Sequence, residues 1–209
     1  RRKAEFGIMR IISGKAKGTK LYTLEGTNTR PTLDRVKESI FNIIQNDIED
    51  AEILDLFAGS GAIGLEFLSR GARNAVLCDK SKDATEIIKR NVQKTHMEEK
   101  TQILNLDFET CLDKVKNRQF DIIYIDPPYV TKYILKSIEK IIAQGNLKKE
   151  GIMILETDDE QRILREIESE EVRIVDKRKY GRITAEDGQC RGGHHTGGQQ
   201  CQRAVGAVQ

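Results

Sequence analysis

From Ala51 onward, short apolar runs alternate with amphipathic stretches along the chain. The apolar runs are 4 to 8 residues long and end in turn residues, which is typical of buried strands. They predict six strands, at 52–57, 74–78, 101–106, 120–125, 152–156 and 172–177. The stretches between them have helical spacing and predict helices at 62–69, 82–94, 109–116, 132–143 and 160–169. This alternation of strands and helices predicts a Rossmann-like α/β fold, with a mostly parallel sheet covered by helices on both faces.

The N-terminal part has a different pattern. Two short runs, 8–13 and 19–24, flank the sequence SGKAKG and predict a β-hairpin with Lys15 and Lys17 at its tip. A helix follows, with Thr32 as its N-cap after Pro31. We therefore divide the chain into a leader of vector origin (1–8), a hairpin and helix (9–48), an α/β domain (49–184) and a tail (185–209). The tail is rich in Gly and Gln and is predicted to be disordered.

Charge is distributed unevenly over the 209 residues, although the net charge is only +2. Residues 1–37 contain ten Lys or Arg and three Asp or Glu, so the remainder is mildly acidic. A basic arm on an acidic body favours a polyanionic partner such as a nucleic acid. No apolar run reaches the roughly 18 residues that a membrane helix needs. Four scattered cysteines argue against a disulfide scaffold and favour the cytoplasm.

A glycine-rich motif follows the first strand of the α/β domain. The segment 55–64, DLFAGSGAIG, contains the GxGxxG pattern and leads into a helix, and Asp79 ends the next strand. This arrangement is typical of a nucleotide-binding turn with a ribose-binding acid. A nicotinamide enzyme fits the motif nearly as well as an enzyme that binds an adenosyl cofactor.

Acidic residues stand at the ends of the first four strands: Asp55, Asp79, Asp107 and Asp126. Ligands of open α/β sheets bind at this edge. Four carboxylates suit a ligand rich in donors, with a ribose diol, an amino group and an ammonium, and they suit an anionic pyrophosphate poorly. S-adenosylmethionine has all three donors and no phosphate. Each Asp could instead be a helix N-cap, and Asp107 stands directly before a predicted helix.

The segment Asp126-Pro127-Pro128-Tyr129 follows the apolar strand DIIYI. Two prolines remove two backbone N–H donors, so the local backbone presents only carbonyl oxygens beside the Asp126 carboxylate. Such a group of acceptors suits an exocyclic amine, whose two hydrogens it would hold. Tyr129 supplies a ring on which a flipped base can stack.

With these motifs, the chain resembles the class I S-adenosylmethionine-dependent methyltransferases. More narrowly, it resembles the RsmD-like bacterial enzymes, which methylate the N2 amine of a guanine in 16S ribosomal RNA. The motifs are MRIISGKAKGTKL (9–21), RPTLDRVKESIFNII (30–44), ILDLFAGSGAIGLEFLSRGA (53–72) and DIIYIDPPY (121–129). The chain departs from the family after Ile183, where such proteins form a last, antiparallel strand.

The resemblance implies a role for each motif. The methionine part of the cofactor would lie against Asp55, Phe57, Ala58, Gly59, Ser60 and Gly61. Asp79 would take the ribose hydroxyls, Asp107 the adenine amino group, and Arg30 and Thr32 would close over the cofactor. The target amine would be held by Asp126, Pro127, Pro128 and Tyr129.

The resemblance also implies how RNA is bound. Phosphate contacts would come from Arg10, Lys15, Lys17 and Lys20, on a hairpin docked beside the catalytic edge of a monomer. The substrate would be 16S ribosomal RNA, either free or in an assembling small subunit.

Two other functions share part of this pattern. A DNA adenine-N6 methyltransferase would use the same Asp-Pro-Pro-Tyr segment, but it usually needs a larger target-recognition domain than the N-terminal part offers. A nucleotide-binding oxidoreductase or a non-catalytic Rossmann module would leave that segment without a role. We predict no metal, because the spacing of Cys190, His194, His195 and Cys201 is not that of a zinc finger.

Overall fold

The computed structural model describes residues 9–24, 31–128, 131–157, 172–179 and 202–208. Its strands are β1 (Glu52–Asp55), β2 (Asn74–Cys78), β3 (Thr101–Leu104), β4 (Phe120–Ile125), β5 (Leu147–Thr157), β6 (Val172–Lys179) and β7 (Gln202–Val208). Its α-helices are α1 (Pro31–Ile43), α2 (Ala62–Ser69), α3 (Lys82–Thr95), α4 (Phe108–Lys114) and α5 (Thr131–Gln144). Short 3-10 turns lie at Gln45–Asp47 and Glu98–Lys100. The helix predicted at 160–169 lies outside the described residues.

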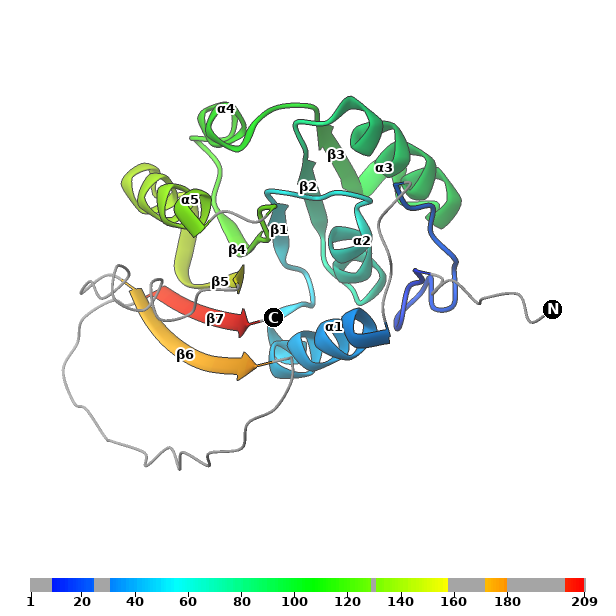
Figure 1. The fold of residues 1–209 in the computed structure, drawn as a ribbon, viewed down its shortest axis with the longest axis horizontal. Helices are drawn as coiled ribbons and strands as arrows, with labels where there is room; N and C mark the ends of the chain where they lie inside the picture. Colours follow the sequence, from blue (N-terminus) through cyan, green and yellow to red (C-terminus); the bar gives the residue numbers. More distant parts are fainter. Residues whose placement is uncertain (1–8, 25–30, 129–130, 158–171, 180–201, 209) are drawn as a thin grey trace.

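The seven strands form one sheet in the order β3-β2-β1-β4-β5-β7-β6 (Figure 1). All six pairings are parallel, including the first pair, in which Glu52 lies opposite Asn74. The predicted α/β fold with a parallel sheet is therefore confirmed. Because the strands run parallel, their C-terminal ends share one edge, which we call the carboxyl edge.

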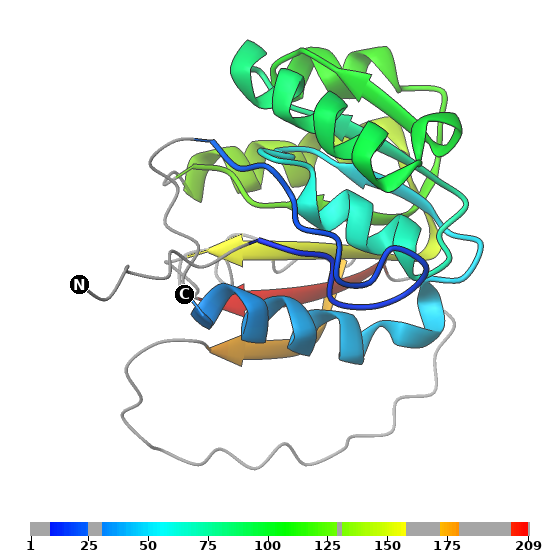
Figure 2. The same cartoon turned by 90° about the vertical axis from the view of Figure 1, so that its right-hand side faces the viewer.

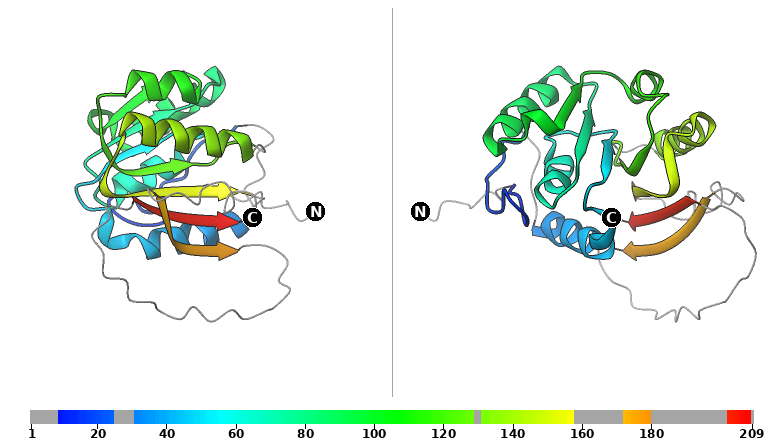
Figure 3. Two further views of the ribbon diagram at one scale, coloured as in Figure 1. Left: turned by 90° about the vertical axis from the view of Figure 1, so that its left-hand side faces the viewer. Right: turned by 180° about the vertical axis from the view of Figure 1, so that it is seen from behind.

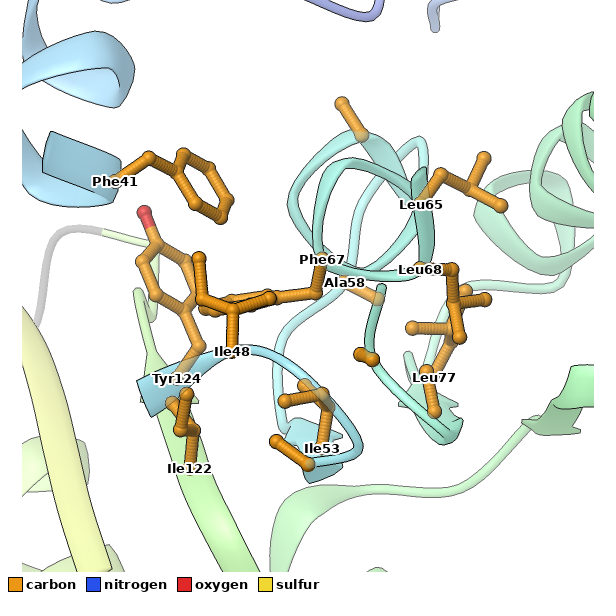
Figure 4. Close-up of a cluster of buried hydrophobic side chains, with 14 of the residues drawn as sticks. Phe41, Ile48, Ile53, Ala58, Leu65, Phe67, Leu68, Leu77, Ile122 and Tyr124 are labelled. Atoms are coloured by element: carbon orange, nitrogen blue, oxygen red, sulfur yellow. The ribbon is translucent and has the colours of Figure 1, made fainter. Parts of the chain in front are cut away.

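The sheet has a hydrophobic layer on each face. Strand residues alternate between the layers: Ile53 packs with α1, α2 and α3, whereas Leu54 packs with α4 and α5. Figure 4 shows part of the first layer, where Phe41 of α1 contacts Phe67 of α2 with ring centroids 4.7 Å apart. Burial on both faces explains why the strand sequences are almost continuously apolar.

The C-terminal strand differs from the sequence-based prediction. The tail was predicted to be disordered, but residues 202–208 form β7, inserted between β5 and β6 (Figure 3, left). Ile152 of β5 lies opposite Arg203, and Val172 of β6 lies opposite Gln202. Pairing on both sides satisfies the backbone hydrogen bonds of this strand, and the two valines of its sequence QRAVGAV favour strand conformation. The strand is parallel to both neighbours, whereas the family resemblance implied an antiparallel last strand.

The predicted hairpin is present only in outline. The two arms meet in a single antiparallel bridge between Arg10 and Lys20, with Leu21 N–H donating to the Met9 carbonyl at 2.8 Å. Residues 9–24 contain no strand, since other backbone groups of the arms bind helix side chains instead. The Glu66 carboxylate accepts from the N–H groups of Ile12 (2.7 Å) and Ser13 (3.0 Å).

The hairpin tip lies far from the carboxyl edge. Lys15 N–H donates to the Ser69 carbonyl at 2.8 Å, at the end of α2. A Cβ on Gly14 would lie 1.8 Å from that carbonyl oxygen, so only glycine fits there. Figure 2 shows the tip on the side away from the arrowheads of β5 and β7. The predicted docking of the hairpin beside the catalytic edge therefore applies only to the end opposite the tip. There, Ser60 Oγ donates to Met9 Sδ at 3.3 Å.

Candidate active site

The predicted glycine turn connects β1 to α2 at the carboxyl edge. Ala58 N–H donates to the Cys78 carbonyl at 2.8 Å, which ties the turn to the end of β2. Gly61 is the residue before α2 and has φ of 78°, a left-handed conformation that glycine adopts without strain. The strand–turn–helix arrangement predicted for this motif is confirmed.

Asp55 is buried beneath this turn, with 1% of its surface exposed. Its Oδ2 atom accepts a hydrogen bond from Gly64 N–H at 3.3 Å, while Oδ1 has no partner among the described residues. Burial raises the pKa of Asp55 to about 7. A buried acceptor without a donor is costly, so a cationic or donor-rich ligand beside it would be favoured. The ammonium of S-adenosylmethionine fits this requirement.

Asp79 lies just after β2 and faces the same turn. Its Oδ2 accepts from Gly59 N–H at 2.9 Å and its Oδ1 from Ser81 N–H at 2.8 Å. These two bonds hold the carboxylate rigidly, and each oxygen keeps a free lone pair for another donor. The position is compatible with the predicted contact to a ribose diol.

Asp107 is the N-cap of α4. Its carboxylate accepts from Thr110 N–H at 3.0 Å and from the Thr110 hydroxyl at 2.7 Å. The Thr110 hydroxyl and amide lower the pKa of Asp107. The alternative role that the sequence left open for this residue, helix capping, is therefore present, and any contact to adenine would come in addition to it.

Asp126 follows β4, with Pro127 buried and Pro128 exposed. Burial and, to a lesser extent, the charges of Glu156 and Asp55 raise the pKa of Asp126 well above its ordinary value. Because burial opposes its negative charge, the environment of Asp126 favours a positively charged neighbour. These properties suit a group that holds an amine as positive charge develops on it.

Glu156 was not among the predicted site residues, yet it belongs to this cluster. It is buried near the end of β5, and the Tyr124 hydroxyl donates a hydrogen bond to it. Ile125 lies opposite Leu155, so the next residues, Asp126 and Glu156, follow side by side on adjacent strands. The sequence signal was available, because Glu156 ends an apolar strand just as the four aspartates do.

Register also explains why the acids lie on one face. Tyr124 packs in the α1–α3 layer, and Asp126 stands two residues later on the same strand face. Asp55 lies opposite Tyr124, and Glu156 stands two residues after Ile154 of the same layer. Three carboxylates from β1, β4 and β5 thus point toward the α1–α3 side of the carboxyl edge.

An aromatic row lies on the other side. Phe57 of the glycine turn is 5.6 Å from Phe108, and Phe108 is 5.5 Å from Tyr133 of α5, measured between ring centroids. All three side chains are partly exposed. The predicted cofactor contact Phe57 therefore belongs to a partly open apolar surface next to the turn.

The structure thus gathers most of the predicted site. At the carboxyl edge lie Asp55, Phe57, Ala58, Gly59, Ser60, Gly61, Asp79, Asp107, Asp126, Pro127 and Pro128. Arg30, Tyr129 and the side chain of Thr32 lie outside the described residues, as do Cys190, His194, His195 and Cys201. In the described part of the chain, no three His, Cys, Asp or Glu side chains are placed so that they could hold a metal ion, and no helix is long and apolar enough to cross a membrane.

The sheet order, the glycine turn after β1 and the Asp-Pro-Pro segment after β4 define a class I S-adenosylmethionine-dependent methyltransferase. Within that class, the chain belongs to the family described as "Conserved hypothetical protein 95", whose model matches residues 9–186. It is 38% identical over 154 residues to YlbH of Bacillus subtilis. The matched region covers 73% of this chain and 84% of that protein.

Two further relatives support the assignment. The chain is 33% identical over 163 residues to "Ribosomal RNA small subunit methyltransferase D" of Haemophilus influenzae, covering 76% of this chain and 83% of that one. The solved structure of yhhF from Escherichia coli aligns with a TM-score of 0.63 at 33% identity, over 70% of this chain and 78% of that chain.

Proposed function

We propose that this protein transfers a methyl group from S-adenosylmethionine to the N2 amine of a guanine in 16S ribosomal RNA. The observation that carries the proposal is the Asp126-Pro127-Pro128 segment at the carboxyl edge, beside the buried carboxylates of Asp55 and Glu156. Relatives named as small-subunit ribosomal RNA methyltransferases support the RNA substrate.

When bound, S-adenosylmethionine supplies an electrophilic methyl group on a sulfonium. The chain's residues would hold the cofactor by its polar ends, with Asp55 at the ammonium and Asp79 at the ribose hydroxyls. Asp107 and the partly exposed Phe108 beside it would contact the adenine. Arg30 and Thr32 would close over the cofactor.

The other half of the site would orient the amine. Asp126 and the Pro127 carbonyl would each accept one amine hydrogen, which turns the nitrogen lone pair out of the conjugated ring and toward the methyl group. Tyr129 would stack on the base. Orientation and stabilisation of the positive charge that develops on nitrogen provide the rate gain.

The test is methyl transfer from tritiated S-adenosylmethionine to naked 16S ribosomal RNA and to small subunits, followed by nucleoside analysis. We expect N2-methylguanosine in the naked RNA, in the small subunits or in both. We also expect the enzyme to be a monomer and to act in the cytoplasm. N6-methyladenosine, or methylation of DNA only, would refute the proposed target while keeping the methyltransferase assignment. The Asp126→Ala variant controls for contaminating activity.

A further inference from the structure

An exposed tyrosine stands between the hairpin and α3. Tyr22 has 39% of its surface exposed. Among the described residues, it is the only large hydrophobic side chain that is exposed. Arg90 Cζ lies 3.9 Å and Lys94 Nζ 4.4 Å from the centroid of its ring. Two cations from consecutive turns of α3 therefore gather on one aromatic ring.

Two more cations lie on the same outer face of the hairpin. Lys20 and Tyr22 are exposed, whereas Leu21 between them is buried. Arg10 pairs with Lys20 in the antiparallel bridge, and residues directly opposite in such a pair point to the same side. We call the set Arg10, Lys20, Tyr22, Arg90 and Lys94 the Tyr22 patch.

The patch is locked to the glycine turn through a buried side chain. Asn91 Oδ1 accepts from Tyr22 N–H at 2.7 Å, and Asn91 Nδ2 donates to the carbonyls of Tyr22 (2.9 Å) and Ser60 (2.8 Å). Asn91 has no exposed surface. Tyr22 is thus held rigidly relative to Ser60, a residue of the proposed cofactor turn.

The charges of the patch are not compensated within the described residues. None of its four cations forms a salt bridge there, and Glu86, one turn before Arg90, pairs with Lys89 at 2.7 Å instead. Like charges at i and i+4 of a helix, as at Arg90 and Lys94, destabilise the helix, and like charges opposite each other in a strand pair destabilise the pair. Bound anions would relieve both repulsions.

We infer that the Tyr22 patch binds phosphates of the RNA substrate, and that Tyr22 offers the exposed part of its ring to an unpaired base. The inference rests on the proposed function for the identity of the polyanion. Cations around an exposed aromatic ring are the combination that tracks a nucleic acid backbone and stacks its bases. The hairpin tip lacks this combination, because Lys15 and Lys17 are exposed at the far end of α2 without an aromatic side chain in the turn.

The test compares two double variants that each remove two exposed cations: Arg90→Ala/Lys94→Ala and, as the matched control at the far end of α4, Lys114→Ala/Lys116→Ala. The measurement is the affinity for a 16S ribosomal RNA fragment as a function of salt. Loss of two phosphate contacts to a single strand should lower the slope of log K against log salt by about 1.4. We expect this change in the α3 variant, with the control close to wild type.

Equal changes in both variants would show that only net charge matters and would overturn the inference, as would an unchanged slope in the α3 variant. Calorimetry with S-adenosylmethionine checks that each variant is folded. Tyr22→Leu should weaken RNA binding, while Tyr22→Phe should retain it. Binding to phosphatidylglycerol vesicles that is lost in the α3 variant, with RNA binding unchanged, would assign the patch to a membrane surface instead.

The two proposals can fail separately. If nucleoside analysis finds no methylated guanine but the α3 variant still loses RNA binding, the patch stands and the target is wrong. If guanine is methylated and the α3 variant binds RNA as wild type does, the target stands and the patch is wrong.

Discussion

Two groups of carboxylates share the carboxyl edge and differ in what surrounds them. Asp79 and Asp107, after β2 and β3, accept hydrogen bonds from nearby N–H groups of the turns and helix that follow. Asp55, at the end of β1, and Asp126, just after β4, lie close to each other and to Glu156, and burial raises the pKa of both. Hydrogen bonds from the backbone hold the carboxylates of the first group, whereas burial of the second group disfavours the charged form.

This difference suggests separate tasks for the two groups, one in binding the cofactor and one next to the reacting atoms. A carboxylate that is already hydrogen-bonded stabilises local structure and presents a fixed acceptor. A buried carboxylate with an oxygen that lacks a donor, such as Asp55 Oδ1, gains most from a positive charge, whether an ammonium or an amine that becomes cationic. The reacting centre is therefore expected on the β1–β4–β5 side and the nucleoside contacts on the β2–β3 side.

The largest effect is expected at Asp126. Asp126→Ala removes both the charge and the acceptor, and we expect a loss of about 10²–10³-fold in single-turnover methyl transfer, by analogy with removing one group that stabilises transition-state charge. Asp126→Asn keeps one acceptor oxygen and should fall between Ala and wild type. Cofactor binding by calorimetry should be retained in both, and full activity of the Ala variant would refute the role.

Asp79→Ala should act on binding instead of on the chemical step. Charged hydrogen bonds of this kind contribute about 1.5–3 kcal/mol each, so losing the two bonds to the ribose hydroxyls should lower the affinity for S-adenosylmethionine by about 100-fold or more. Asp83→Ala, an exposed acid in the first turn of α3, removes the same charge and serves as control. Calorimetry measures both, and wild-type affinity in the Asp79 variant would exclude the ribose contact.

Glu156→Gln should change the pH dependence of the reaction. Asp126 accepts hydrogen bonds best when ionised, and its raised pKa means that activity increases with pH as the proton leaves. Removing the like charge of Glu156 lowers that pKa, so the rising limb of the pH–rate profile should move to lower pH. An unmoved limb, with folding retained, would show that Glu156 does not act on Asp126.

The smallest effect is expected at Asp107, where two roles can be separated. Asp107→Ala removes the N-cap of α4 and should lower the free energy of unfolding by about 1 kcal/mol, whereas Asp107→Ser should restore most of it. A loss of cofactor affinity in both variants would support the adenine contact. Unchanged affinity in both would leave Asp107 with capping alone.

The core of this comparison could be predicted from the sequence. Continuous apolar strands fix a parallel sheet, and a parallel sheet brings residues such as Asp55, Asp79 and Asp126 to one edge whatever the side-chain details. The glycine turn follows equally from local rules, because Gly61 occupies a left-handed position at a helix start.

Features that depend on tertiary contacts could not be predicted. The docking of the hairpin on α2 depends on two side chains that look like ordinary polar helix residues in the sequence. Glu66 accepts from the N–H groups of Ile12 and Ser13, and Ser69 Oγ accepts from Ala16 N–H. Strand β7 has too little apolar surface to be recognised alone, and it is held by pairing with β5 and β6. The sequence contains both features, but their partners are distant along the chain: Lys179 pairs with Val208, and Ile12 N–H binds Glu66.

The central claim is that the carboxyl edge divides into stabilised and destabilised carboxylates, and the most direct test is a carboxyl-carbon NMR titration of protein with ¹³C-labelled aspartate. Asp107→Asn and Asp126→Asn variants assign the two signals. We predict that Asp107 titrates below the ordinary aspartate range and Asp126 well above it, with the Asp126 transition moving down in Glu156→Gln. Titration of both residues together at ordinary low pH, unaffected by Glu156→Gln, would contradict the account.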